Sequence, residues 1–119
     1  MLGLQNAEPA LHLLTHPLVP YFMFISNMTH FLDVEGNIAK EMSKIARERA
    51  SFIAMIIDEA TKPPTEEYLE LRCMKKKCKG TIEIMILDET EEIEYWCTDC
   101  PNINGRVSGW QGTIWDNRK

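Results

Sequence analysis

Four cysteines constrain this chain more than any other feature of its sequence. They are Cys73, Cys78, Cys97 and Cys100, so a pair with four residues between its members is followed, after 18 residues, by a pair with two between them. Two close cysteine pairs joined by an insert of hairpin length are typical of a site where four thiolates hold one Zn²⁺ ion. Each short turn directs two sulfur atoms at one point, and a hairpin returns the second pair to the first. The sequence therefore predicts one structural zinc site with these four ligands.

Other uses of the cysteines stay open, and each has a feature against it. Disulfides are rare in the reducing cytosol, and no cationic segment begins a secretory signal, because the first Lys or Arg is Lys40. A cytoplasmic protein is therefore expected. A redox C-x-x-C pair opens a helix, whereas Pro101 follows Cys100 directly. An iron–sulfur cluster also takes four thiolates, but the spacing matches neither common ferredoxin pattern. Cysteines that bind no metal are the last alternative.

Length and charge limit the remaining choices. A chain of 119 residues forms one domain, or one small domain with an appendage. Its net charge of −5 argues against a protein dominated by nonspecific DNA binding, and no apolar run is long enough to cross a membrane. We expect residues 1–27 to be a poorly structured extension, 28–66 a helical segment and linker, and 67–119 the zinc-binding domain. That last segment is small enough to need a metal for stability.

Residues 38–60 carry the clearest helical pattern. Apolar residues recur there every three or four positions, as on one face of a helix. Asn37 is the expected N-cap, and Pro63 ends the helix. The segment 52–57 is apolar nearly all round and is expected to be buried on more than one side.

After this helix the pattern changes to the alternation of β-strands. Strands are expected at 68–73, 81–87, 93–97 and 106–115. If residues 88–91 form a hairpin turn, Ile86 faces Ile93, Ile84 faces Tyr95 and Ile82 faces Cys97 on one side of the sheet. The expected fold class is α+β, with one long N-terminal helix packed on a small antiparallel sheet that holds the zinc site.

The segment 70–116 resembles a zinc ribbon. More loosely, the chain from Met28 is similar to a family of short, uncharacterised bacterial proteins, through a start like Met28-Thr-His-Phe-Leu-Asp33 and an ending like Gly109-Trp-Gln-Gly-Thr-Ile-Trp-Asp116. The resemblance implies a zinc-ribbon fold and no assigned activity. Ribbons often place glycine soon after the second cysteine of a pair, whereas Cys100 is followed by Pro-Asn-Ile-Asn-Gly105.

Lysines and tryptophans suggest what the domain binds. The lysines lie around the first cysteine pair, where they either contact nucleic-acid phosphates or offset the negative charge of the thiolates; they are Lys75, Lys76, Lys77 and Lys79. Of Trp96, Trp110 and Trp115, we expect at least two to be buried, although exposed tryptophans stack on bases.

No motif for phosphate-loop, metalloprotease or hydrolase chemistry is present, so no enzyme, no small-molecule substrate and no membrane association are expected. The prediction is a noncatalytic zinc-binding module with nucleic acid as a candidate partner. The alternative is a protein–protein adaptor that uses the apolar surface of residues 52–57 and 18–25.

Overall fold

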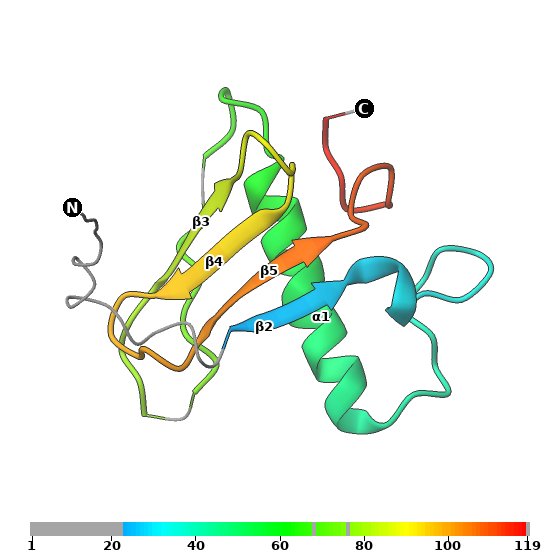
Figure 1. Ribbon diagram of the computed structural model, residues 1–119, viewed down its shortest axis with the longest axis horizontal. Coiled ribbons are helices and arrows are strands. Elements are labelled where there is room, and N and C mark those ends of the chain that lie inside the picture. The colour runs from blue at the N-terminus through cyan, green and yellow to red at the C-terminus, as the bar shows by residue number, and fades with distance from the viewer. Residues whose placement is uncertain (1–22, 68, 76, 119) are drawn as a thin grey trace, which may run out of the picture.

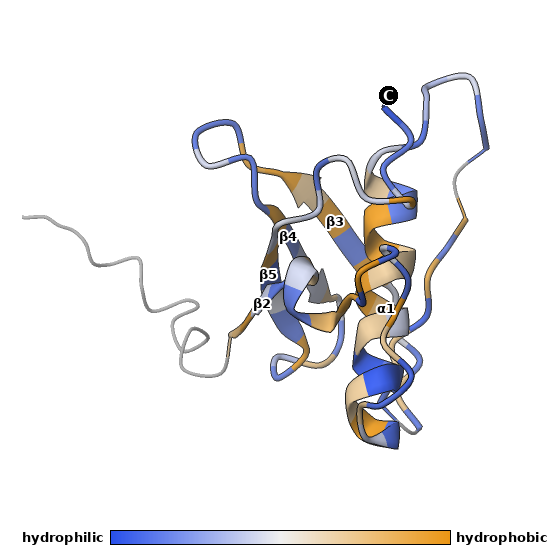
Figure 2. Ribbon diagram, turned by 90° about the vertical axis from the view of Figure 1, so that its right-hand side faces the viewer, coloured by the Kyte–Doolittle hydropathy of each residue, from blue (hydrophilic) through white to orange (hydrophobic). Residues whose placement is uncertain are grey.

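A four-stranded sheet with one helix on its face makes up the structure (Figure 1). The computed structural model describes residues 23–67, 69–75 and 77–118. The strand order is β2-β5-β4-β3, and Figure 2 shows the helix on one side of the sheet. The elements are β2 (Phe24–Asn27), the 3-10 helix η2 (Met28–Phe31), α1 (Lys44–Ala60), β3 (Ile82–Ile86), β4 (Ile93–Cys97) and β5 (Asn104–Ser108). The expected α+β class is confirmed.

The hairpin formed by β3 and β4 has the predicted register. Ile82 lies opposite Cys97, Ile84 opposite Tyr95, and Ile86 opposite Ile93. Residues on this face are buried or half-buried, while Glu83, Met85 and Trp96 on the other face are exposed. The alternation holds because a shift of one residue would turn every apolar side chain toward solvent.

The prediction of a purely antiparallel sheet is wrong. Strand β2 pairs with β5 in parallel, with Phe24 opposite Gly105. A Cβ atom at Gly105 would lie 2.5 Å from the Phe24 carbonyl oxygen and 2.6 Å from the Tyr95 hydroxyl. The missing side chain therefore lets β2 approach a strand that already packs against Tyr95. Residues 24–27 belong to the sheet, which the sequence did not indicate; residues 1–22 lie outside the described part, and the division into three segments stays a prediction.

Two of the predicted strands are much shorter than expected, and a third, 81–87, loses one residue at each end. Residues 106–115 form a strand only to Ser108, because Gly109 takes a positive φ of 67° and turns the chain away. Of residues 68–73, Tyr68 is not described. Among the others only Arg72 is paired, in an isolated bridge with Thr81.

Helix α1 begins six residues later than predicted. Ser43 rather than Asn37 is the N-cap, and its Oγ accepts a hydrogen bond from the Ala46 N–H at 3.2 Å. Ile38 instead bridges to Leu32, and Ile45 is 78% exposed, so neither extends the buried helix face. The end of the helix at Ala60 agrees with the prediction.

The hydrophobic core lies between the second half of α1 and the sheet. Phe52, Ile53, Ile56 and Ile57 are buried, and the Phe52 ring meets Tyr95 edge-on with ring centres 5.7 Å apart. The predicted burial of residues 52–57 on more than one side is confirmed except at Met55, which is half exposed.

Alanine substitutions at Gly109 and Gly112 test the contact between the end of β2 and the C-terminal segment. Both have positive φ, but a Cβ at Gly109 would collide with the Asn27 side chain, whereas a Cβ at Gly112 meets nothing within 4 Å. We expect Gly112→Ala to cost about 1 kcal/mol of backbone strain, and Gly109→Ala to cost about 3 kcal/mol because overpacking adds to that strain. Chemical denaturation measures both. Equal losses would contradict the close contact between Gly109 and Asn27.

Candidate metal centre

The four cysteines lie at one end of the β3–β4 hairpin, in two backbone turns. In the first turn the Cys78 N–H donates to the Lys75 carbonyl at 3.0 Å, and the Cys73 N–H donates to the Gly80 carbonyl at 3.1 Å. In the second the Ile103 N–H donates to the Cys100 carbonyl at 3.1 Å, and the Cys97 N–H donates to the Ile103 carbonyl at 2.9 Å. Each turn thus folds back on itself and presents two thiols on its inner side.

The sulfur atoms of the four cysteines form one cluster. All four lie within 4.8 Å of one another, with Cys78 Sγ 3.6 Å from Cys97 Sγ and 3.0 Å from Cys100 Sγ. Zinc–sulfur bonds of about 2.3 Å in a tetrahedron place the sulfurs about 3.8 Å apart. Cys73 and Cys97 are buried, and Cys78 and Cys100 are half-buried. The donor set and its spacing therefore fit a tetrahedral metal ion.

Backbone N–H groups point at three of the sulfurs. Gly80 N–H donates to Cys78 at 3.3 Å, Lys75 N–H to Cys73 at 3.4 Å, and the N–H groups of Asp99 and Cys100 both donate to Cys97 at 3.3 Å. Hydrogen bonds of this kind favour the charged form of a thiol. The turns therefore offset part of the negative charge that four thiolates bring together.

The protons of the cluster are shared unevenly. The Cys100 thiol and the Gly80 N–H hydrogen-bond to Cys78 and lower its pKa to about 7. The same bond from Cys100 to Cys78, together with desolvation, raises the pKa of Cys100 to about 12. Burial raises the pKa of Cys73. A metal ion entering the cluster must therefore displace protons from several thiols.

Gly80 belongs to the site, although the sequence analysis did not single it out. It is buried, and a Cβ there would lie 2.7 Å from Cys97 Sγ and 3.0 Å from the Asp99 backbone nitrogen. The signal that could have found it is its position two residues after Cys78, where a metal-binding turn brings its backbone close to a sulfur.

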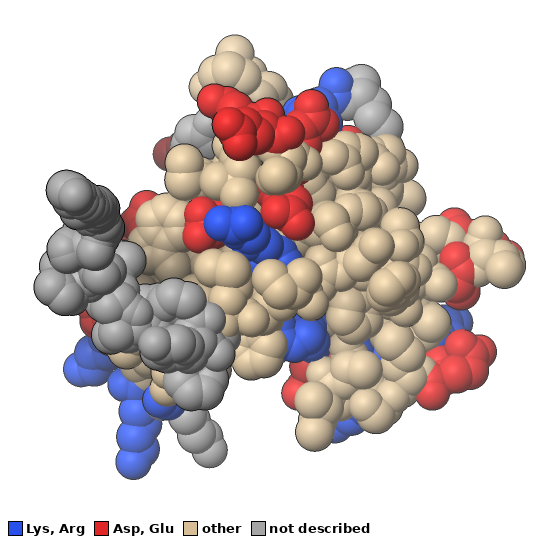
Figure 3. Space-filling model, in the orientation of Figure 1, with Lys and Arg blue, Asp and Glu red and all other residues tan. Residues whose placement is uncertain are grey.

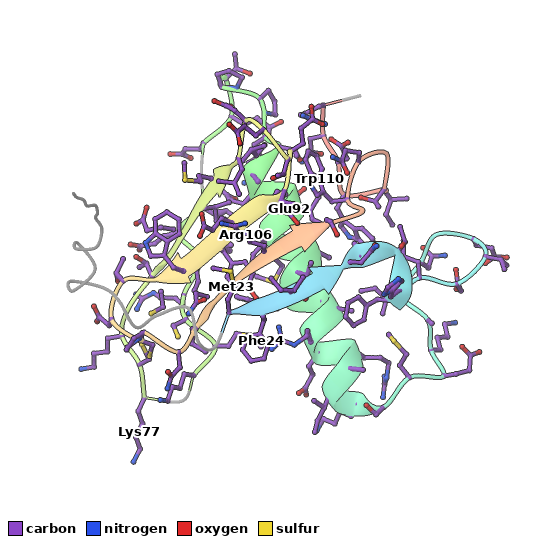
Figure 4. The ribbon with its side chains drawn as sticks, in the orientation of Figure 1. Met23, Phe24, Lys77, Glu92, Arg106 and Trp110 are labelled. Atoms are coloured by element: carbon purple, nitrogen blue, oxygen red, sulfur yellow. The ribbon has the colours of Figure 1, made fainter. Side chains whose placement is uncertain are left out.

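The lysines of the first turn surround the cluster on the outside. Lys75, Lys77 and Lys79 are exposed, and Lys76 lies outside the described residues. Figure 3 shows basic side chains at the end of the molecule that carries the metal-binding turns, and acidic ones at the opposite end. Figure 4 shows Lys77 extending away from the protein. Lys77 also has a positive φ of 69°, which completes the turn before Cys78.

The three tryptophans have three different environments. Trp110 is fully buried, and its Nε1 donates to the Glu91 carbonyl at 2.9 Å, while Trp115 is half-buried against the core. Trp96 is 37% exposed on the face of the sheet turned away from α1. Burial, expected for at least two of them, is complete at Trp110 and partial at Trp115.

Comparisons with protein-family models, with curated proteins and with solved structures find no match for this chain. The resemblance to a family of short bacterial proteins therefore stays a prediction, and the site is interpreted from its own geometry. In the described part of the chain, no helix has the length and apolar character that spanning a bilayer requires.

Replacing Gly80 by alanine tests the packing of the metal centre. The new methyl group would press on Cys97 Sγ and on backbone, neither of which can move without displacing a ligand. We expect Gly80→Ala to weaken metal binding by about tenfold or more, as losses in the supporting shell of a site do. Competition with a chelator measures the affinity. Lys79→Ala, at the exposed neighbour, is the control and should lose much less affinity, because it removes a charge near the thiolates but leaves their packing unchanged. Equal losses in the two variants would show that the packing at Gly80 is not needed.

Proposed function

We propose that this protein is a noncatalytic module of zinc-ribbon type, in which Cys73, Cys78, Cys97 and Cys100 hold one structural Zn²⁺ ion and the lysines of the first turn bind nucleic-acid phosphates. The observation that carries the proposal is the convergence of four sulfurs from two turns, backed by four backbone N–H bonds. A tetrathiolate set of this kind suits zinc better than oxygen-preferring cations such as Mg²⁺ or Ca²⁺.

A structural role follows from the number of ligands. Four protein ligands fill a tetrahedron and leave no position for the water that a catalytic zinc ion activates. When bound, the ion supplies a crosslink between the two turns. The second turn begins at Cys97, which is the last residue of β4 and lies on the buried face of that strand opposite Ile82.

Nucleic acid is the partner that the surface favours over a protein. The apolar side chains of residues 52–57, on which an adaptor would depend, are packed against the sheet except for Met55. Of residues 18–25, the structure describes only 23–25. Phe24 and Ile25 are exposed there, at the edge of the sheet, and are the apolar side chains of this segment that an adaptor would have. By contrast, Lys75, Lys77 and Lys79 are all exposed in one turn, where each can contact a phosphate. A cytoplasmic location accords with thiols that stay reduced.

Elemental analysis should find one zinc ion per chain in protein purified without a chelator. Because the metal-free cluster holds protons, as the raised pKa values of Cys73 and Cys100 indicate, zinc competes with protons for the sulfurs. We expect the apparent affinity to fall as the pH is lowered from 8 to 6, by about tenfold per pH unit for each proton displaced. Chelator competition at several pH values measures this. A folded protein with little bound metal, or a pH-independent affinity, would contradict the assignment.

Exchange of lysines tests the binding of nucleic acid. Removing two phosphate contacts by Lys75→Gln and Lys77→Gln should weaken binding to single strands of any sequence. It should also reduce the slope of log affinity against log salt by up to about 1.4. Titrations at two salt concentrations measure the slope.

The matched control is the double variant Lys40→Gln and Lys44→Gln, which removes the same charge from exposed residues remote in sequence from the metal-binding turns. It should lower the affinity less. Absence of binding by the unmodified protein at low salt would reject nucleic acid as the partner, and a similar loss in both double variants would reject the turn as the contact site.

A further inference from the structure

A hollow on the outer face of the sheet borders the metal centre. Its volume of about 430 Å³ lies within the range of small-ligand sites. The cysteines Cys97 and Cys100 form part of its wall. Most of the remaining lining is apolar or aromatic; its main residues are Met23, Met85, Trp96, Pro101, Ile103 and Asn104.

Trp96 gives this hollow an aromatic wall. It lies on β4 between Glu83 of β3 and Asn104 of β5, and alternation along the strand turns its side chain away from α1. More than a third of it is exposed, whereas Trp110 is fully buried. An accessible indole beside an apolar hollow provides a surface on which a planar ring stacks.

Asn104 adds an unused hydrogen-bond acceptor. It is 7% exposed, and its Nδ2 donates to the Pro101 carbonyl at 2.8 Å, which fixes the orientation of the amide. Among the described residues, no group donates to its Oδ1, which is buried as well. Buried acceptors are nearly always paired, so this oxygen lacks a donor; an N–H group in the hollow supplies one only when the side chains that cover the oxygen move aside.

A second, basic hollow lies directly beside the first. Its volume is about 480 Å³, and Lys75, Lys77 and Lys79 line it together with Asp99. Cys100 lines both hollows, so the two meet at the metal centre. Three lysines outnumber the Asp99 carboxylate on the basic side. The half-buried Glu94 also lines the apolar side, where its carboxylate disfavours phosphate and is available to accept a hydrogen bond from a ligand N–H group.

We propose that the apolar hollow binds one base of a single-stranded nucleic acid, with the ring against Trp96 and an N–H group of the base donating to Oδ1 of Asn104. The phosphates beside that base contact the lysines of the neighbouring hollow. This inference rests on the proposed function, because it assumes that the lysines hold the strand. It adds that the protein distinguishes a strand with bases from a bare phosphate backbone.

The test compares three probes of equal length with the full chain: an oligothymidylate, an oligomer of N3-methylthymidine and an abasic oligomer. The methylated base keeps its ring and loses its N–H group. We expect the affinity to fall in that order, and Trp96→Ala to weaken binding of oligothymidylate by about tenfold. Trp96→Phe keeps an aromatic ring and should retain most of the affinity while losing the tryptophan fluorescence change that accompanies binding. Ile45→Ala, at an exposed apolar residue of α1, is the control and should bind as the unmodified protein does.

The outcomes separate this inference from the proposed function. Equal binding of all three probes would leave phosphate contact standing and overturn the base site. Equal binding of the two thymidine oligomers would overturn the role of Asn104. Binding of none would overturn both proposals, and a protein captured through this face would then be the alternative. If Trp96→Ala loses its metal or its fold, the affinity and the fluorescence of Trp96→Phe still show whether the base stacks on residue 96.

Discussion

The pairing of β3 with β4 determines where the metal centre forms. The strands keep their register to their ends, where Ile82 lies opposite Cys97. The Thr98 N–H then donates to the Thr81 carbonyl at 2.9 Å, and the Thr81 N–H to the Thr98 hydroxyl at 3.2 Å. These bonds carry the hairpin past its last strand residues and into both metal-binding turns. Gly80 and Cys97 consequently lie so close together that a methyl group on Gly80 would collide with Cys97 Sγ.

Local patterns in the sequence were sufficient for the hairpin and for the clustering of the cysteines. Alternation fixes which face of a strand is buried, and the length of the turn fixes which residues lie opposite, so the three predicted pairs of β3 and β4 are found. The end of α1 was readable because two prolines follow it. Its start was not predictable, because Ile38 and Met42 continue the helical spacing of apolar residues. In the structure Ser43 is the N-cap, and Ile38 forms a bridge with Leu32 instead.

Long-range partners were beyond a reading of local patterns. Nothing in the sequence of Phe24–Asn27 indicates that its partner is β5. The strand fits there because Gly105, which lies against Tyr95, has no side chain. The C-terminal segment likewise depends on distant contacts. The Asn117 N–H donates to the Thr61 hydroxyl, 56 positions earlier in the chain. Local bonds complete this segment, because the buried Asp116 carboxylate accepts from the N–H groups of Gly112 and Arg118. Desolvation alone would raise the pKa of Asp116, but these hydrogen bonds and the Arg118 guanidinium hold it below its usual value.

The parallel pairing of β2 with β5 has a consequence for how the chain folds. Phe24 lies opposite Gly105, so these partners are 81 positions apart in a chain of 119 residues. Closing so long a loop costs chain entropy before any contact repays it, and contacts of this range slow folding. During synthesis β2 leaves the ribosome well before its partner β5 has been made. We therefore expect the three-stranded meander of β3, β4 and β5 to form first, with β2 completing the sheet as one of the last steps of folding.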